Sequence, residues 1–209
     1  FYATKNITTG EGGIVTTDDD EIAEQLRMLR SHGMANRDEH VTLGYNYRMS
    51  DLNGAIGTAQ VDRLDGFNDR RREISERLAT ELGDLDWLQP ATVREYVDHA
   101  YFWAPFEVQE NKIGLTGKEV WAELRERGVE TRHRYNVPLY DQPVFTDHRG
   151  FNSEFPWSAN PNDHDYNLSL PNVEKVVGSM IGLPNHPGLE TEDIEYVIET
   201  VRSFDPEDQ

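Results

Sequence analysis

The residue best suited to chemistry is Lys5, which stands just before a glycine-rich turn. It is one of only four lysines, against sixteen arginines. The first thirteen residues read FYATKNITTGEGG, and Gly10, Gly12 and Gly13 permit a tight turn. A lysine amine forms an imine when a turn holds it against a carbonyl carbon. The alternative is a surface lysine before an ordinary β-turn, and residue types alone leave both interpretations open.

The spacing of these residues excludes two phosphate-binding motifs. A P-loop has the pattern GxxxxGK[ST], with the lysine after the glycines, whereas Lys5 precedes them. The dinucleotide fingerprint GxGxxG fails as well, because the three glycines have a different spacing and no strand precedes them.

The composition restricts the partners and the compartment. The chain has 39 acidic and 20 basic side chains, a formal net charge of -19. This balance argues against DNA, RNA and anionic membranes, which require a basic surface. The absence of cysteine excludes disulfides and thiolate metal sites. No apolar run approaches the ~18 residues of a membrane span, and no signal peptide is visible. We therefore expect a cytoplasmic protein with no nucleic-acid or membrane partner.

Lys5 must be positioned by the elements of the first 82 residues. Apolar spacing, helix caps and β-branched runs predict these elements. They are a strand at 14–17, a helix from about Asp20 to His32-Gly33, a polar exposed stretch at 34–42, a loop at 43–50, and one long helix from Ser50 to about Leu82. The long helix could link two domains.

Residues 83–209 have the pattern of a small α+β domain. The expected elements are a strand at 100–108, a helix from Thr116 to Arg127, a strand at 129–132, an irregular loop at 136–170, a helix at 173–179, a strand at 180–183 and a last helix capped by Thr191. An acidic tail follows Phe204. We therefore divide the chain into a first domain at 1–82 and a second domain at 83–209.

Six ordered blocks carry a family resemblance. They are FYATKNITTGEGGIVTTDD (1–19), LRSHG (29–33), LGYNYRMSDLNGAIGTAQVDRLD (43–65), HAYFWAPF (99–106), GVETRHRYNVPLYDQPVF (128–145) and IGLPNHPG (181–188). Together they resemble the DegT/DnrJ/EryC1/StrS aminotransferases, which are pyridoxal-phosphate sugar aminotransferases of fold type I. The resemblance implies an α/β protein that contains the end of the large cofactor domain and the whole small α+β C-terminal domain.

The resemblance also implies roles for particular residues. Lys5 matches the lysine that forms the imine with pyridoxal phosphate and then moves a proton during catalysis. Asn46 matches an asparagine that bonds the cofactor phosphate in the neighbouring subunit, and Arg48 matches an arginine that meets the carboxylate of the amino donor. Tyr140 stands where the family often has the histidine of PLH, and His186 in LPNHP is a second candidate for lining the substrate pocket. For the last four residues a purely structural role stays open.

The implied reaction is a two-stage amino transfer. Glutamate gives its amino group to the cofactor and leaves as 2-oxoglutarate, and the amino group then passes to a keto group of a nucleotide-linked sugar. The expected partner is a second copy that shares its active sites, or a separate chain that supplies the N-terminal half. Two alternatives stay open: a non-catalytic homologue that binds or regulates a partner, and an aminotransferase for a cyclitol or another ketone. No metal is expected, since His164 is interpreted as a solvated loop residue.

In relatives of this kind, the groups that bind the pyridine ring and most of the phosphate would precede residue 1. We therefore expect the 209 residues alone to hold the cofactor poorly. The isolated chain, mixed with pyridoxal phosphate, is expected to show no absorbance in the imine band. A yellow protein that borohydride reduces would contradict this expectation.

The acidic, lysine-poor composition predicts a surface adapted to high salt. Repulsion among the excess carboxylates is screened by ions, so dilution of salt should destabilise the fold. We expect the melting temperature to fall as sodium chloride is diluted. A melting temperature that does not depend on salt would contradict the interpretation.

Overall fold

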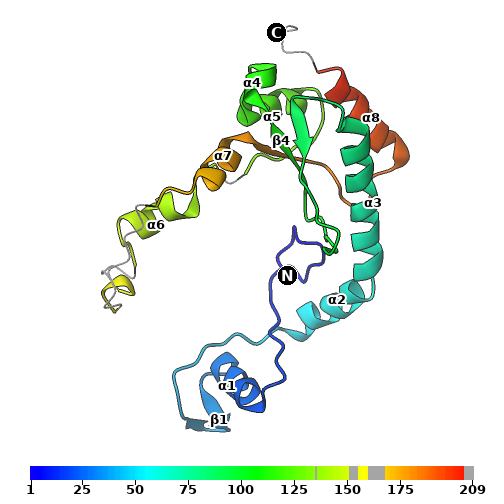
Figure 1. Ribbon diagram of the computed structural model, residues 1–209. Helices are drawn as coiled ribbons and strands as arrows, with labels where there is room; N and C mark the ends of the chain where they lie inside the picture. The colour runs from blue at the N-terminus through cyan, green and yellow to red at the C-terminus, as the bar shows by residue number, and fades with distance from the viewer. Residues whose placement is uncertain (135, 151–154, 160–167, 205–209) are drawn as a thin grey trace. The chain divides into compact units, whose positions relative to one another are not determined.

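The computed structural model describes residues 1–134, 136–150, 155–159 and 168–204. The chain forms two compact units, residues 1–68 and residues 69–209, with the division inside helix α3 (Leu64–Leu82; Figure 1). No helix in the described ranges is both long and apolar enough to cross a membrane. The assignment of 1–82 and 83–209 to a large and a small domain stays a prediction.

The first unit contains the predicted helix α1 (Asp20–Arg30) and a short hairpin. Asp19 caps α1, because its carboxylate accepts from the backbone N–H groups of Glu21 at 2.9 Å and Ile22 at 3.0 Å. The hairpin pairs β1 (Met34–Asn36) with β2 (Glu39–His40) in antiparallel register. It lies within the stretch predicted to be polar and exposed.

The predicted strand at 14–17 is wrong. These residues have no regular secondary structure, and the side chains of Ile14 and Val15 are 74% and 67% exposed. A strand requires a neighbour that pairs with its N–H and C=O groups. None of the described backbone hydrogen bonds involves residues 14–17.

The single long helix predicted from Ser50 is also wrong, because two helices occupy this stretch. They are α2 (Asp51–Val61), capped by Ser50, and α3. At the break, the N–H of Asp62 still bonds the carbonyl of Thr58, four residues back, at 3.2 Å. The N–H of Arg63 bonds the carbonyl of Gln60, only three residues back, at 3.2 Å. This tighter turn interrupts the α-helical pattern.

The second unit is built on a three-stranded antiparallel sheet with the order β3-β4-β5. Its strands are β3 (Leu88–Pro90), β4 (Ala104–Val108) and β5 (Met180–Leu183), with Leu88 opposite Val108 and Phe106 opposite Ile181. Buried and half-buried residues alternate along β4, so one face of the strand is fully covered by the core.

Helices supply the rest of this core. They are the end of α3 and the helices α4 (Glu110–Ile113), α5 (Gly117–Glu126) and α8 (Thr191–Arg202). Helix α7 (Pro171–Ser179) lies against α5 and β4 and has no buried residue. The apolar stripe of α3 ends in Ile74, Leu78 and Leu82, which are all buried. Helix α8 runs beside α3 (Figure 1), where Arg77 pairs with Glu195 at 3.5 Å.

The predicted caps of α5 are confirmed, whereas the predicted cap of α8 is wrong by one residue. Thr116 and Glu119 form the capping box that starts α5, and Gly128 follows the helix with φ 83°. The cap of α8 is Glu190, with Asp193 as its partner, one residue before the predicted Thr191.

Two of the predicted strands are wrong in extent. Residues 100–103 precede β4 without strand pairing, and Tyr101 has φ 41°, which strand geometry does not allow. Residues 129–132 contribute only one bridge, between Arg132 and Gly182.

Short helical turns interrupt the loop predicted at 136–170. They are η1 (Leu139–Asp141), α6 (Pro143–Thr146) and η2 (Trp157–Ala159). His164 and the acidic tail from residue 205 lie outside the described residues.

The core of the second unit can be tested with two leucines. Leu124 of α5 is fully buried, whereas Leu139 of η1 is 70% exposed. We expect Leu124→Ala to lower the free energy of unfolding by about 2–5 kcal/mol, because it removes apolar contacts and leaves a cavity. Leu139→Ala is the matched control, with an expected change within about 0.5 kcal/mol. Equal effects of the two substitutions in urea denaturation would contradict this description of the core.

Candidate active site

Lys5 is exposed, and it lies on a turn that backbone hydrogen bonds among the first nine residues close. Its backbone N–H bonds the carbonyl of Tyr2 at 3.0 Å, and the N–H of Thr9 bonds the carbonyl of Phe1 at 3.1 Å. Tyr2 and Gly10 form a parallel bridge across the turn. The amine is therefore carried by a segment whose backbone is fixed on both sides.

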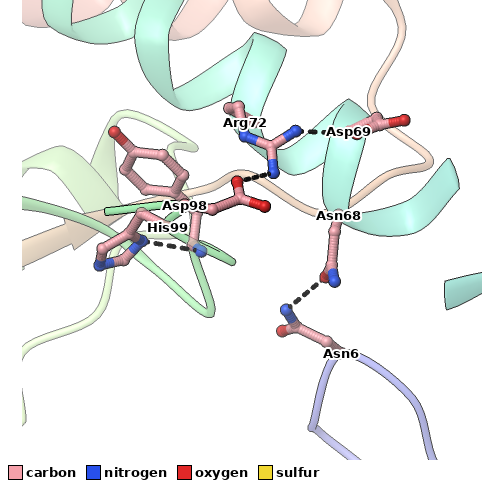
Figure 2. A network of polar contacts seen from close by, with 7 residues as sticks. Asn6, Asn68, Asp69, Arg72, Asp98 and His99 are labelled. Atoms are coloured by element: carbon pink, nitrogen blue, oxygen red, sulfur yellow. Dashed lines mark hydrogen bonds and ion pairs between the residues drawn. The ribbon is translucent and has the colours of Figure 1, made fainter. Parts of the chain in front are cut away.

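Three amide side chains attach this lysine turn, residues 1–13, to the helices α2 and α3. Asn53 donates to the carbonyl of Thr9 at 2.5 Å, and Gln60 accepts from the N–H of Thr8 at 3.2 Å. Figure 2 shows the third contact, in which the amide of Asn6 donates to Asn68 at 2.9 Å. Hydrogen bonds spaced along the turn in this way hold the residue after Lys5 and the start of the glycine run in place.

Close packing supports the same attachment. Thr9 is only 2% exposed. Gly57 of α2 lies so close that a Cβ atom there would be 3.0 Å from the Thr9 methyl group. The prediction of the site missed Asn53, Gln60 and Asn68. The sequence shows an amide-rich run that begins at Asn53, but nothing in that run indicates which groups of the lysine turn these amides bond.

Asn46 and Arg48 lie in the loop at 45–48, which packs on the end of α1. The N–H groups of Tyr45 and Tyr47 bond the carbonyls of Leu29 and Arg30 at 2.7 and 3.0 Å. Arg48 donates to the hydroxyl of Ser31 at 3.1 Å. The backbone of the loop is thus held while its side chains stay exposed.

A cavity of about 1060 Å³ lies within the first unit, between the glycine run, α1 and the residues after Tyr47. Arg27, Arg30 and Arg48 line it together with one acid, Glu11. Three guanidinium groups favour an anionic occupant. Lys5 and Asn46 are not among its lining residues.

The two remaining candidates belong to the second unit. The hydroxyl of Tyr140 donates weakly to Glu174 at 3.5 Å, and Glu174 also accepts from the N–H of Leu170 at 3.0 Å. Desolvation and the nearby Glu174 carboxylate raise the pKa of Tyr140. His186 is exposed, and its carbonyl accepts from the N–H of Leu189 at 3.1 Å. The roles of all five predicted residues stay predictions.

Metal binding has no support in the described ranges, which hold no group of three His, Cys, Asp or Glu side chains able to bind an ion.

Comparisons with known proteins connect this arrangement to one enzyme family. Residues 1–202 match the model of the DegT/DnrJ/EryC1/StrS aminotransferase family. The chain is 31% identical over 216 residues to the spore coat polysaccharide biosynthesis protein SpsC of Bacillus subtilis, covering 98% of this chain and 52% of SpsC. The chain spans about half the length of the curated relatives it matches.

Two solved structures have a similar fold. One is PseC of Helicobacter pylori, an aminotransferase involved in pseudoaminic acid biosynthesis, with a TM-score of 0.79, 25% identity, and coverage of 98% of this chain and 52% of PseC. The other is the aminotransferase TlmJ of Streptoalloteichus hindustanus, with a TM-score of 0.74, 30% identity, and coverage of 93% and 48%.

These similarities confirm the predicted fold class, that of the pyridoxal-phosphate-dependent sugar aminotransferases of fold type I. Because the family model matches nearly the whole sequence, the chain belongs to the DegT/DnrJ/EryC1/StrS aminotransferase family.

Proposed function

We propose that this chain carries the catalytic lysine of a pyridoxal-phosphate-dependent aminotransferase, which moves an amino group from glutamate to a keto group of a nucleotide-linked sugar. The observation that carries the proposal is the lysine turn. Lys5 is exposed, and the residues beside it are held by Asn53, Gln60 and Asn68. A turn fixed at several points can hold an amine against a carbonyl carbon. The similarity to SpsC, a protein of polysaccharide biosynthesis, supports a sugar substrate.

The residues present suit the chemistry of pyridoxal phosphate at two of its groups. Its aldehyde requires a primary amine, which Lys5 offers at the surface of the turn. Its phosphate requires hydrogen-bond donors, and the exposed amide of Asn46 is one. When bound, the cofactor supplies stabilisation of negative charge at the substrate carbon that carries the nitrogen.

The protein contributes proton transfer and positioning. The Lys5 Nζ removes the proton from Cα of the amino donor and returns a proton in the second half of the reaction. Arg48 binds the donor carboxylate through its guanidinium group. Its exposed position on the loop at 45–48 supports this role, because an exposed guanidinium group is accessible to a carboxylate.

The loop at 45–48 is proposed to enter the active site of a second copy of the chain. Its side chains are exposed, with Tyr45 56% and Tyr47 70% accessible, and the two rings stack at 4.7 Å. Large exposed aromatic side chains are common at protein interfaces. Tyr140 and His186 are proposed to contact the sugar, in a protein of the cytoplasm.

The lysine assignment is testable because the chain has only three other lysines: Lys112, Lys118 and Lys175. The protein is prepared as its own gene encodes it, with any residues that precede Phe1. We expect borohydride to fix the cofactor on the peptide that contains Lys5, as mass spectrometry would show. Lys5→Ala should remove the label and lower amino transfer from glutamate by at least about 100-fold, since it removes the acid–base group.

Lys118→Ala is the matched control and should keep both label and activity. A label on one of the other three lysines would disprove the assignment of Lys5. An unlabelled protein without transferase activity would favour the non-catalytic homologue instead.

A further inference from the structure

The second unit contains a buried guanidinium group with only one described hydrogen bond. Arg71 of α3 is 8% exposed, and its one described hydrogen bond runs from Nη1 to Oδ1 of Asn185 at 3.5 Å. Its Nε is buried, and no acceptor in the described ranges bonds it. Among the described residues, no carboxylate lies within 4.0 Å of Arg71. Burying a charge without a compensating partner is unfavourable.

The neighbouring arginines of the same helix show that this is not the usual arrangement. Arg70, Arg72 and Arg77 are more exposed than Arg71, and each has a carboxylate at 2.7–2.8 Å. In a chain with 39 acidic residues, a carboxylate partner is readily available. The most buried arginine of the helix is nevertheless the one that lacks such a partner within the described structure.

A second arginine makes the surroundings more positive. Arg132 is half-buried, and its guanidinium lies 5.8 Å from the ring of Phe102 and 5.9 Å from that of Trp103. Its backbone is fixed by hydrogen bonds in both directions to Gly182, at 2.8 and 2.7 Å. Burial lowers the pKa of Arg71, and the charge of Arg132 lowers it further. The negative charge of a bound anion would offset both effects.

The contact with Asn185 involves only one corner of the Arg71 guanidinium. The Asn185 amide nitrogen donates to the hydroxyl of Ser75 at 3.2 Å and to the carbonyl of Tyr101 at 2.8 Å. These bonds direct its oxygen to Nη1 of Arg71. The Nε–Nη2 edge of Arg71 has no described partner, and this edge presents two parallel donors at the spacing of the oxygens of a carboxylate.

We propose that Arg71 and Arg132 form a binding site for a small carboxylate ligand. The Nε–Nη2 edge of Arg71 binds the two oxygens, and Arg132 supplies the second positive charge from the more exposed side. Asn185 and Ser75 hold Arg71 in position without contacting the ligand. The site does not depend on the proposed amino transfer.

The test uses the whole chain and four sodium salts at equal ionic strength: acetate, glutamate, phosphate and chloride. We expect acetate and glutamate to raise the melting temperature above its value in chloride, with saturation. In calorimetric titration, Arg71→Met should weaken carboxylate binding by about 10- to 100-fold, because it removes hydrogen bonds to a charged group. In chloride, it should melt at the same temperature as the unchanged protein or higher, since it removes a buried unpaired charge.

Arg77→Met is the matched control, from a paired arginine of the same helix, and should bind carboxylate unchanged. Arg132→Gln should weaken binding as well, and it serves as the test if Arg71→Met does not fold. Three results would overturn the proposal: an equal effect of all four salts, which is a nonspecific salt effect; a response to phosphate alone; or unchanged binding after substitution of Arg71 or, in its place, Arg132.

Discussion

Burial of the apolar stripe of α3 is the interaction on which the second unit depends. Ile74, Leu78 and Leu82 are at most 1% exposed, and each fully buried side chain of this kind contributes about 1.5–3 kcal/mol. The same stripe fixes the rotation of the helix about its axis. Because neighbouring positions on a helix face different directions, this rotation turns Arg71 inward while Arg70 and Arg72 reach their carboxylates nearer the surface. Packing of the hydrophobic core thus determines which arginine of α3 is buried away from solvent.

Local features could be predicted from the sequence, and long-range pairing could not. The capping box at Thr116 and the position of Lys5 before a turn follow from residues within a few positions of each other. The break at Asp62-Arg63 could not be predicted from apolar spacing, because the backbone of Asp62 keeps right-handed helical angles. The amides that hold the lysine turn come from positions 44 to 62 residues away, and amide side chains carry no signal that identifies a distant partner.

The strongly acidic composition has different consequences at the surface and in the interior. At the surface, exposed ion pairs such as those of Arg70 and Arg77 contribute little each and are screened by salt. In the interior, Arg71 bonds the amide of Asn185 and feels the charge of Arg132, and it has no carboxylate partner within the described part of the chain. The net charge therefore indicates the character of the exposed surface, but it does not predict which partners a buried charged side chain has.

Two glycines, Gly33 and Gly44, allow the close main-chain contacts that set the backbone path leading into the loop at 45–48. A Cβ atom on Gly33 would lie 1.8 Å from the carbonyl oxygen of Thr42, and one on Gly44 would lie 2.0 Å from the nitrogen of Gly33. Backbone therefore packs directly on backbone here, and the path of the loop is set by main-chain contacts rather than by its side chains. A side chain at Gly33 or Gly44 would force these main chains apart and so displace the backbone that carries Asn46 and Arg48.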